Sequence, residues 1–86
     1  MNLTFSPQAW DDYTYWQATE PKVVSRINLL LKDIIRSPHS GIGKPETLKH
    51  ALRGYWSRRI DSEHRLVYRA VEGGILIAQL RFHCDT

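Results

Sequence analysis

The sequence has one cysteine and no long apolar run. Cys84 cannot form a disulfide within the chain, so a reducing, cytoplasmic compartment is expected. No apolar run approaches the roughly 18 residues of a membrane span, and Met1–Ser6 is too short for a signal peptide, so we expect no membrane association. A hydrophobic fraction of 42% with three Trp indicates a single folded domain over residues 1–86.

Positive charge is unevenly distributed along the chain. Residues 44–69 hold seven of the twelve Lys and Arg but only three acidic residues, whereas residues 1–43 hold four of each sign. A basic excess confined to one segment is typical of a protein that binds a polyanion. An ordinary solvated face explains the same charge equally well, so composition alone does not decide between the two.

The first half of the chain predicts a strand and two helices. Asn2–Phe5 is the expected strand, and Ser6 followed by Pro7 is typical of a helix N-cap and first turn. A second helix is expected to begin near Pro21 and to end before Ser37, which precedes a proline. Apolar residues at helical spacing predict the faces that pack in the core. They are Trp10, Tyr13 and Trp16 in the first helix, and Val23, Val24, Ile27, Leu30, Leu31, Ile34 and Ile35 in the second.

The second half predicts a sheet. After a loop over residues 38–45, the hydrophobic period changes from 3.6 to 2. Within that loop, Gly41-Ile42-Gly43-Lys44 is too short for a Walker phosphate loop. Three alternating runs predict strands joined by hairpin turns: Tyr55–Ile60, Arg65–Ala70 and Ile75–Cys84. The expected fold is α+β, a small antiparallel sheet with two N-terminal helices packed on one face, in the order β-α-α-β-β-β.

Strand alternation gathers basic side chains on the sheet face away from the helices. If Trp56 and Ile60 face the helices, Arg59 lies on the open face, and pairing it with Arg65 would place both near His83. Like charges opposite each other are destabilising, so this cluster suggests an anion bound between them. In the last run, one face is expected to carry Leu76, Ala78, Leu80, Phe82 and Cys84, and the other Ile75, Ile77, Gln79, Arg81 and His83.

Four motifs follow one another over nearly the whole chain. They are Trp10-Asp11-Asp12-Tyr13 with Tyr15-Trp16, Gly43-Lys44-Pro45-Glu46 with Leu48-Lys49-His50, Trp56-Ser57-Arg58-Arg59-Ile60, and Glu63-His64-Arg65-Leu66-Val67-Tyr68. Together they resemble the YoeB family of toxins, in the RelE-like superfamily of bacterial type II toxin–antitoxin systems. The resemblance implies a compact sheet with two helices, which agrees with the periodicity.

The resemblance also implies a function. Members of the family are ribosome-dependent endoribonucleases that cleave mRNA in the A site of the 70S ribosome and thereby inhibit translation. A cognate YefM-like antitoxin neutralises them, and a homodimer or toxin–antitoxin complex is implied. On this chain the resemblance assigns Glu46 as general base, His83 as general acid and Arg65 as the group that stabilises the phosphate. It also implies Lys49 and Arg59 as supporting phosphate or transition-state contacts. Two more cations of the basic segment, Lys44 and Arg58, are further candidates for binding RNA or its phosphates.

The residue types suit this chemistry. RNA supplies its own nucleophile, the 2′-OH, so the reaction needs neither a metal nor a cofactor. A base removes the 2′ proton, an acid protonates the departing 5′ oxygen, and an arginine stabilises the charge on phosphorus. Glu and His with ordinary pKa values are a weak base and a largely unprotonated acid at pH 7. We therefore expect the isolated protein to be a poor nuclease that the ribosome and its mRNA complete.

Several alternatives remain open at this stage. Glu46 also suits a cap of a short helical turn, and Arg58 is expected at the sheet edge, where it contacts ribosomal RNA or is merely solvated. The family has a tyrosine where this chain has Cys84, which puts base positioning and rate in doubt. Among the other histidines, His39 and His50 are expected at the surface and His64 in a structural role.

Two other functions also fit parts of the pattern. A non-catalytic ribosome- or RNA-binding inhibitor of translation would keep the basic face without needing Glu46 and His83. A gyrase-directed toxin of the same superfamily would act on a protein target. The combined Glu, Arg and His set favours the nuclease.

Overall fold

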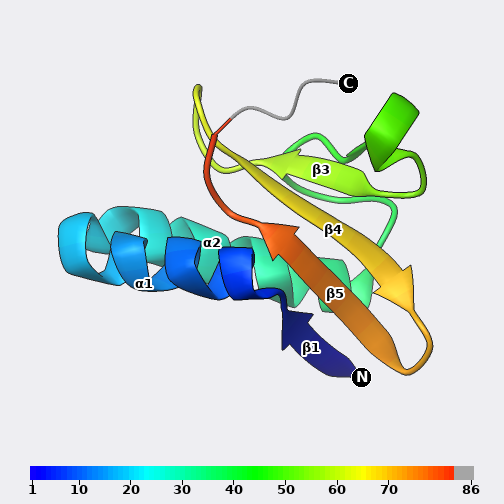
Figure 1. Cartoon of the computed structure of the whole chain (residues 1–86), viewed down its shortest axis with the longest axis horizontal. Helices are drawn as coiled ribbons and strands as arrows, with labels where there is room; N and C mark the ends of the chain where they lie inside the picture. Colours follow the sequence, from blue (N-terminus) through cyan, green and yellow to red (C-terminus); the bar gives the residue numbers. More distant parts are fainter. Residues whose placement is uncertain (83–86) are drawn as a thin grey trace.

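The computed structural model describes residues 1–82, which form two helices and a five-stranded sheet (Figure 1). The helices are α1, Pro7–Thr19, and α2, Pro21–Arg36. The strands are β1 Asn2–Phe5, β2 Glu46–Thr47, β3 Trp56–Arg59, β4 Arg65–Val71 and β5 Gly74–Gln79, and a short 3-10 turn, η1, covers His50–Leu52. Within the described residues, neither helix has the length and apolar character needed to cross a membrane.

The strands lie in the order β1-β5-β4-β3-β2, and the helices pack on one face of the sheet (Figure 1). The predicted α+β class and layering are therefore confirmed. Two details differ from the expectation. β1 pairs with β5 in parallel, so the sheet is mixed, and the loop after α2 ends in β2, a two-residue strand that the sequence pattern did not indicate.

The parallel pairing of β1 depends on a close backbone approach. Asn2 lies opposite Gly74, and a Cβ built on Gly74 would lie 2.1 Å from the Asn2 carbonyl oxygen. Glycine at this position allows β1 to reach β5, because any larger residue would collide with backbone.

Helix α1 is capped locally and is fastened to the end of β5. The Ser6 side-chain oxygen accepts a hydrogen bond of 3.0 Å from the Ala9 N–H, as expected for an N-cap. Asp12 is buried, and its carboxylate accepts a 2.9 Å bond from the Leu80 N–H. The Trp16 indole N–H donates to the Leu80 carbonyl, also at 2.9 Å. Both backbone groups of Leu80 are thus held by α1.

The core lies between the helices and the sheet. The predicted stripe of α2 is largely confirmed, although Ile35 remains 37% exposed at its edge. Burying large aliphatic side chains contributes about 1.5–3 kcal/mol each, so this layer is the main source of stability. Its buried members are Ala9, Trp16, Ile27, Leu30, Leu31, Ile34, Ile60, Leu66, Tyr68, Ile75, Ile77 and Leu80.

A β-bulge changes the face assignment in β5. Val67 pairs with Gln79 and Tyr68 pairs with Ile77, so Ala78 has no partner on β4. An extra residue reverses the alternation, which is why Ile77 before the bulge and Leu80 after it both enter the core. The predicted faces of this run were therefore wrong for residues 75–78. The strand also ends at Gln79, earlier than predicted.

Candidate functional site

The open face of the sheet brings Glu46, Ser57 and Arg65 together. Glu46 pairs with Ser57 across β2 and β3, and an Arg65 guanidinium nitrogen donates to the Glu46 carboxylate and, at 2.7 Å, to the Ser57 hydroxyl. The Arg65 side chain is 11% exposed, whereas Glu46 is 55% exposed. A guanidinium fixed by a buried hydroxyl thus presents its charge beside a solvent-accessible carboxylate.

Arg59 extends this site along β3. The structure pairs Arg59 directly with Arg65, which confirms the predicted register, and leaves Arg59 exposed. A pocket of about 130 Å³ lies between them and the following turn, and its lining consists of Arg59, Asp61, Ser62, Glu63 and Arg65. The lining thus carries two arginines and two carboxylates, and the arginines are the groups that can donate charge-assisted hydrogen bonds to an anionic oxygen.

Lys44 and Lys49 lie on either side of Glu46 in the chain. Both are exposed, and Lys44 has a backbone φ of 53°, a left-handed conformation that a non-glycine residue adopts at some cost in free energy. Glu46 itself is in β2 rather than at a helix start, so the capping alternative is not supported. The candidate carboxylate therefore has an exposed lysine before it and another after it in the sequence.

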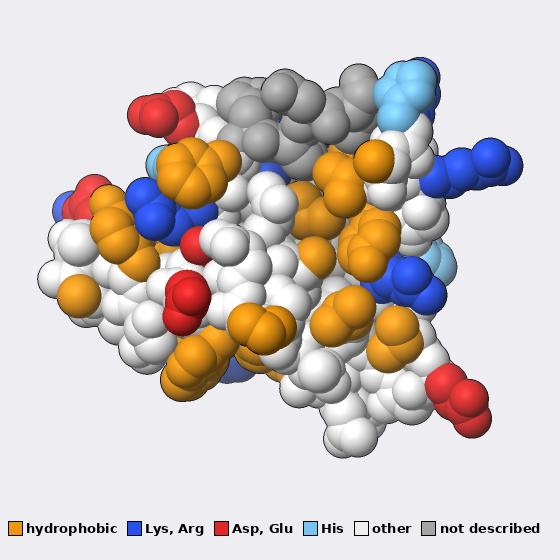
Figure 2. Space-filling model, in the orientation of Figure 1, with side chains coloured by type: hydrophobic (Ala, Val, Ile, Leu, Met, Phe, Trp, Pro, Cys, Tyr) orange, Lys and Arg blue, Asp and Glu red, His pale blue; other side chains and the backbone are white. Residues whose placement is uncertain are grey.

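Beyond this cluster, the open face becomes apolar. Val71 is 37% exposed and Leu76 is partly buried, and the Arg69 guanidinium lies over the Tyr55 ring, 5.4 Å from its centroid. Figure 2 shows hydrophobic side chains gathered over β4 and β5 in this view, with Lys and Arg along the right-hand side of the group. The charged site thus borders an apolar surface.

The last described residue, Phe82, is tied to the start of β4. Its carbonyl accepts a 3.1 Å bond from the Arg65 N–H, and its N–H donates to His64 Nδ1 at 2.7 Å. The His64 ring also packs against Trp16, with centroids 4.9 Å apart, so the structural role predicted for His64 is confirmed. His83 and Cys84, assigned from the sequence, lie outside the described residues.

Comparison with known proteins identifies the family. Residues 5–84 match the family described as "YoeB-like toxin of bacterial type II toxin-antitoxin system". The chain belongs to this family. It is 54% identical over 83 residues to the toxin YoeB of Escherichia coli K12, covering 96% of this chain and 99% of the relative.

Two solved structures agree with this assignment. A YoeB dimer from Staphylococcus aureus has a TM-score of 0.91, and a YoeB–YefM complex from the same organism has a TM-score of 0.90. Each toxin chain is 53% identical to this one, with 98% of both chains covered. The fold of this YoeB-like chain is therefore that of experimentally determined members of its family.

Arg58 does not lie where the sequence placed it. Both expectations, RNA contact and solvation at the sheet edge, required a surface side chain, but Arg58 is fully buried on the helical side of the sheet. Its guanidinium binds Asp33, the Tyr68 hydroxyl and backbone carbonyls of the loop after α2. The placement was wrong because Arg58 follows the inward alternation of Trp56 and Ile60. A fully buried Arg58 side chain does not reach RNA.

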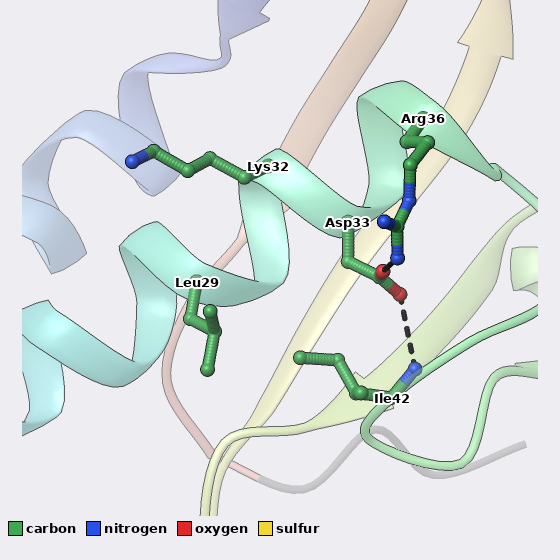
Figure 3. A pocket seen from close by; sticks show the side chains of 5 residues that line it. All are labelled: Leu29, Lys32, Asp33, Arg36 and Ile42. Atoms are coloured by element: carbon green, nitrogen blue, oxygen red, sulfur yellow. Dashed lines mark hydrogen bonds and ion pairs between the residues drawn. The ribbon is translucent and has the colours of Figure 1, made fainter.

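The larger pocket also lies on the helical side. It has a volume of about 400 Å³ and is lined by Leu29, Lys32, Asp33, Arg36 and Ile42 (Figure 3). Asp33 is held there by Arg36 at 2.7 Å and by the Ile42 N–H at 3.0 Å. None of its lining residues belongs to the pocket beside Arg59 and Arg65. Among the described residues, no group of three or more His, Cys, Asp and Glu is arranged to hold a metal ion.

The Asp33 carboxylate should make stability depend on acid pH. Hydrogen bonds from the Ile42 N–H and from Arg58 lower its pKa below the ordinary 3.8, although burial opposes them. A lowered folded-state pKa stabilises the protein above about pH 4, and this contribution is lost as the pH falls through the folded value. We expect the difference in unfolding free energy between wild type and Asp33→Asn to shrink between about pH 5 and pH 2, measured by urea titration. The matched variant is Asp11→Asn, the same substitution at an exposed position of α1, where no buried arginine is paired with the carboxylate.

Proposed function

We propose that this chain is a ribosome-dependent endoribonuclease that cleaves mRNA in the A site and thereby inhibits translation. The observation that supports it is the Glu46–Arg65–Ser57 cluster, in which a largely buried, oriented guanidinium meets an exposed carboxylate on the sheet. Membership in the YoeB-like toxins agrees with an activity that harms the cell producing it.

In the proposed reaction, Glu46 is the general base for the 2′-OH. The guanidinium of Arg65 engages one Glu46 oxygen in the free protein, and an incoming phosphate would compete for that guanidinium. Phosphate binding would therefore both anchor the RNA and release the carboxylate to accept the 2′ proton. Because Glu46 becomes available only when a phosphate has replaced it at Arg65, the site would work only with the RNA correctly positioned.

The other groups complete the acid–base pair and the charge balance. Arg65 stabilises the negative charge that develops on phosphorus, and His83 protonates the departing 5′ oxygen. Lys44, Lys49 and Arg59 neutralise neighbouring phosphates. The nucleophile is the 2′-OH of the RNA, so the mechanism uses no metal, and its products carry a 2′,3′-cyclic phosphate, or its hydrolysed form, and a 5′-OH.

We further propose a YefM-like antitoxin as the partner, and a dimer or a toxin–antitoxin complex as the assembly. The support is the similarity to the S. aureus YoeB dimer and YoeB–YefM structures. A basic site beside an apolar surface would attract an acidic segment with apolar side chains, and such a complex should weaken as salt increases.

The test is to map mRNA cleavage on translating ribosomes by primer extension. The wild-type chain should cut within the A-site codon and leave naked RNA almost intact, and His83→Gln should abolish the cuts whereas exposed His39→Gln should not. A block of translation with intact mRNA would indicate a non-catalytic inhibitor instead. DNA damage with intact translation would indicate a gyrase-directed toxin.

A further inference from the structure

The segment that connects α2 to Glu46 is held by buried side chains rather than by regular structure. Residues 37–45 contain no helix or strand and include two glycines and two prolines. An irregular segment of this length loses considerable conformational entropy when it is fixed in one conformation. The bonds that fix it come from three side chains on three elements: Asp33 of α2, Arg58 of β3 and Tyr68 of β4.

Arg58 uses every hydrogen-bond donor that it has. An arginine offers five N–H groups, and in this fully buried side chain each has an acceptor. Three of the five acceptors are backbone carbonyls of the connecting segment. The bonds are Nε to the Tyr68 hydroxyl at 3.1 Å, Nη1 to Asp33 at 2.6 Å and to the Ile42 carbonyl at 3.2 Å, and Nη2 to the carbonyls of Ser37 at 2.6 Å and Ser40 at 2.9 Å.

Asp33 and Tyr68 add further bonds to the same segment. The Tyr68 hydroxyl donates to the Pro38 carbonyl at 2.6 Å, and Asp33 accepts from the Ile42 N–H at 3.0 Å (Figure 3). A Cβ built on Gly41 would lie 2.0 Å from the Asp33 carboxylate, so the chain passes against that side chain more closely than another residue would allow. The connection is therefore clamped along most of its length.

Arg58 affects the candidate site through its two neighbours in β3. Ser57 pairs with Glu46, and the Arg59 N–H donates to the Gly43 carbonyl at 2.7 Å. Because β2 has only two residues, its own pairing is too short to fix Glu46 independently. The position of Glu46 thus depends on the segment that Arg58 holds.

Stability alone gives no reason for an ion pair at this place. Taking Arg58 and Asp33 out of water carries a desolvation cost, and well-packed apolar residues at such positions are often equally stable or more so. Unlike an apolar pair, the buried ion pair can fix the backbone conformation of the loop, because Arg58 bonds to three of its carbonyls.

We propose that Arg58 is a positioning residue for catalysis, which holds residues 37–45 so that Glu46 meets Arg65 and the RNA. The proposal rests on the function proposed above. Arg58 touches neither RNA nor the reacting atoms, and its effect on the reaction passes through Glu46.

The kinetic test uses Arg58→Lys, because a lysine keeps the charge but cannot bond to five acceptors at once. Single-turnover cleavage of ribosome-bound mRNA should slow by about 10-fold or more, since small misplacements of a catalytic group can cost up to about 100-fold. Ribosome binding should stay within about threefold. In the Glu46→Gln background, the same substitution should have almost no further effect on the rate. An equal slowing in both backgrounds would overturn the proposal.

Backbone hydrogen exchange provides a readout independent of activity. Arg58→Lys should speed exchange about 10-fold at the amides of Ile42, Leu48 and Arg59, and leave that of Ser6, which bonds to the Ile77 carbonyl, unchanged. If the lysine variant does not fold, Tyr68→Phe removes one bond to Arg58 and one to Pro38 and should give the same pattern more weakly.

A core variant separates positioning from general loss of stability. Ile75 is a core residue of β5, away from the connecting segment. Ile75→Ala should therefore lower the melting temperature without slowing cleavage by the folded protein. Equal slowing by Ile75→Ala, or equally faster exchange at Ser6 and Arg59 in Arg58→Lys, would overturn the proposal. If the wild type does not cleave ribosome-bound mRNA, the proposed function fails, and the exchange pattern still decides whether Arg58 positions Glu46.

Discussion

Glu46→Gln is expected to slow cleavage of ribosome-bound mRNA by about 10²–10⁴-fold, the usual contribution of a positioned general base. Glutamine has nearly the same shape and can still accept a hydrogen bond from Arg65, but it cannot take a proton from the 2′-OH. Glu46 is more than half exposed, so losing its ion pair should change the unfolding free energy by less than about 1 kcal/mol. Glu46→Gln should therefore greatly lower the cleavage rate while leaving the unfolding free energy almost unchanged.

The matched control is Glu72→Gln, which makes the same chemical change in the exposed turn between β4 and β5. Both variants should fold and bind ribosomes like the wild type, and only Glu46→Gln should lose the cuts in primer extension. Full activity of Glu46→Gln would remove the general-base assignment. Loss of ribosome binding in this variant would instead place Glu46 among the binding residues.

Arg58→Met should destabilise the protein by about 3–5 kcal/mol, the usual effect of removing one partner from a buried ion pair. The substitution removes the Arg58 bonds to Asp33, to the buried Tyr68 hydroxyl and to three loop carbonyls, and leaves the largely buried Asp33 carboxylate with only its bonds from Arg36 and the Ile42 N–H. A small domain is stable by only about 5–15 kcal/mol, so this variant should be close to unfolding at physiological temperature.

The neighbouring arginine provides the control. Arg59→Met makes the same change one residue later, on the exposed face, and should alter the unfolding free energy by no more than about 0.5 kcal/mol. Urea titration of the two variants measures the difference directly. Arg59→Met should instead weaken cleavage on the ribosome. Similar stability of the two variants would show that the buried network contributes little.

Much of the fold follows from local patterns. The helical period of residues 23–34 predicts the buried face of α2, and alternation in residues 55–70 places Arg59 and Arg65 on the same face. The prediction fails in β5, where the bulge at Ala78 reverses the alternation. A bulge depends on how two strands pair, and one run of alternating residues does not reveal it.

The site was only partly predictable for a related reason. The pairing of Ser57 with Glu46 depends on β2, which is too short to leave a period in the sequence. Arg58 was misplaced because charged residues are rarely buried without partners, and its partners are distant in the chain. Asp33, next to an otherwise apolar stripe, and Tyr68, in an inward position, were the signals that could have revealed it.

The parallel pairing of β1 with β5 also determines how the chain can fold as it is made. Among the described strands β1 is the earliest in the chain, yet the strand it pairs with there is β5, which begins at Gly74. Until β5 has been synthesised, β1 lacks the strand with which it pairs in this sheet. The Asp12 and Trp16 side chains of α1 likewise lack the Leu80 backbone groups to which they bond. Such long-range closure slows folding. β1 can therefore join the sheet only after β5 has been synthesised, so the complete core forms late rather than one element at a time during synthesis.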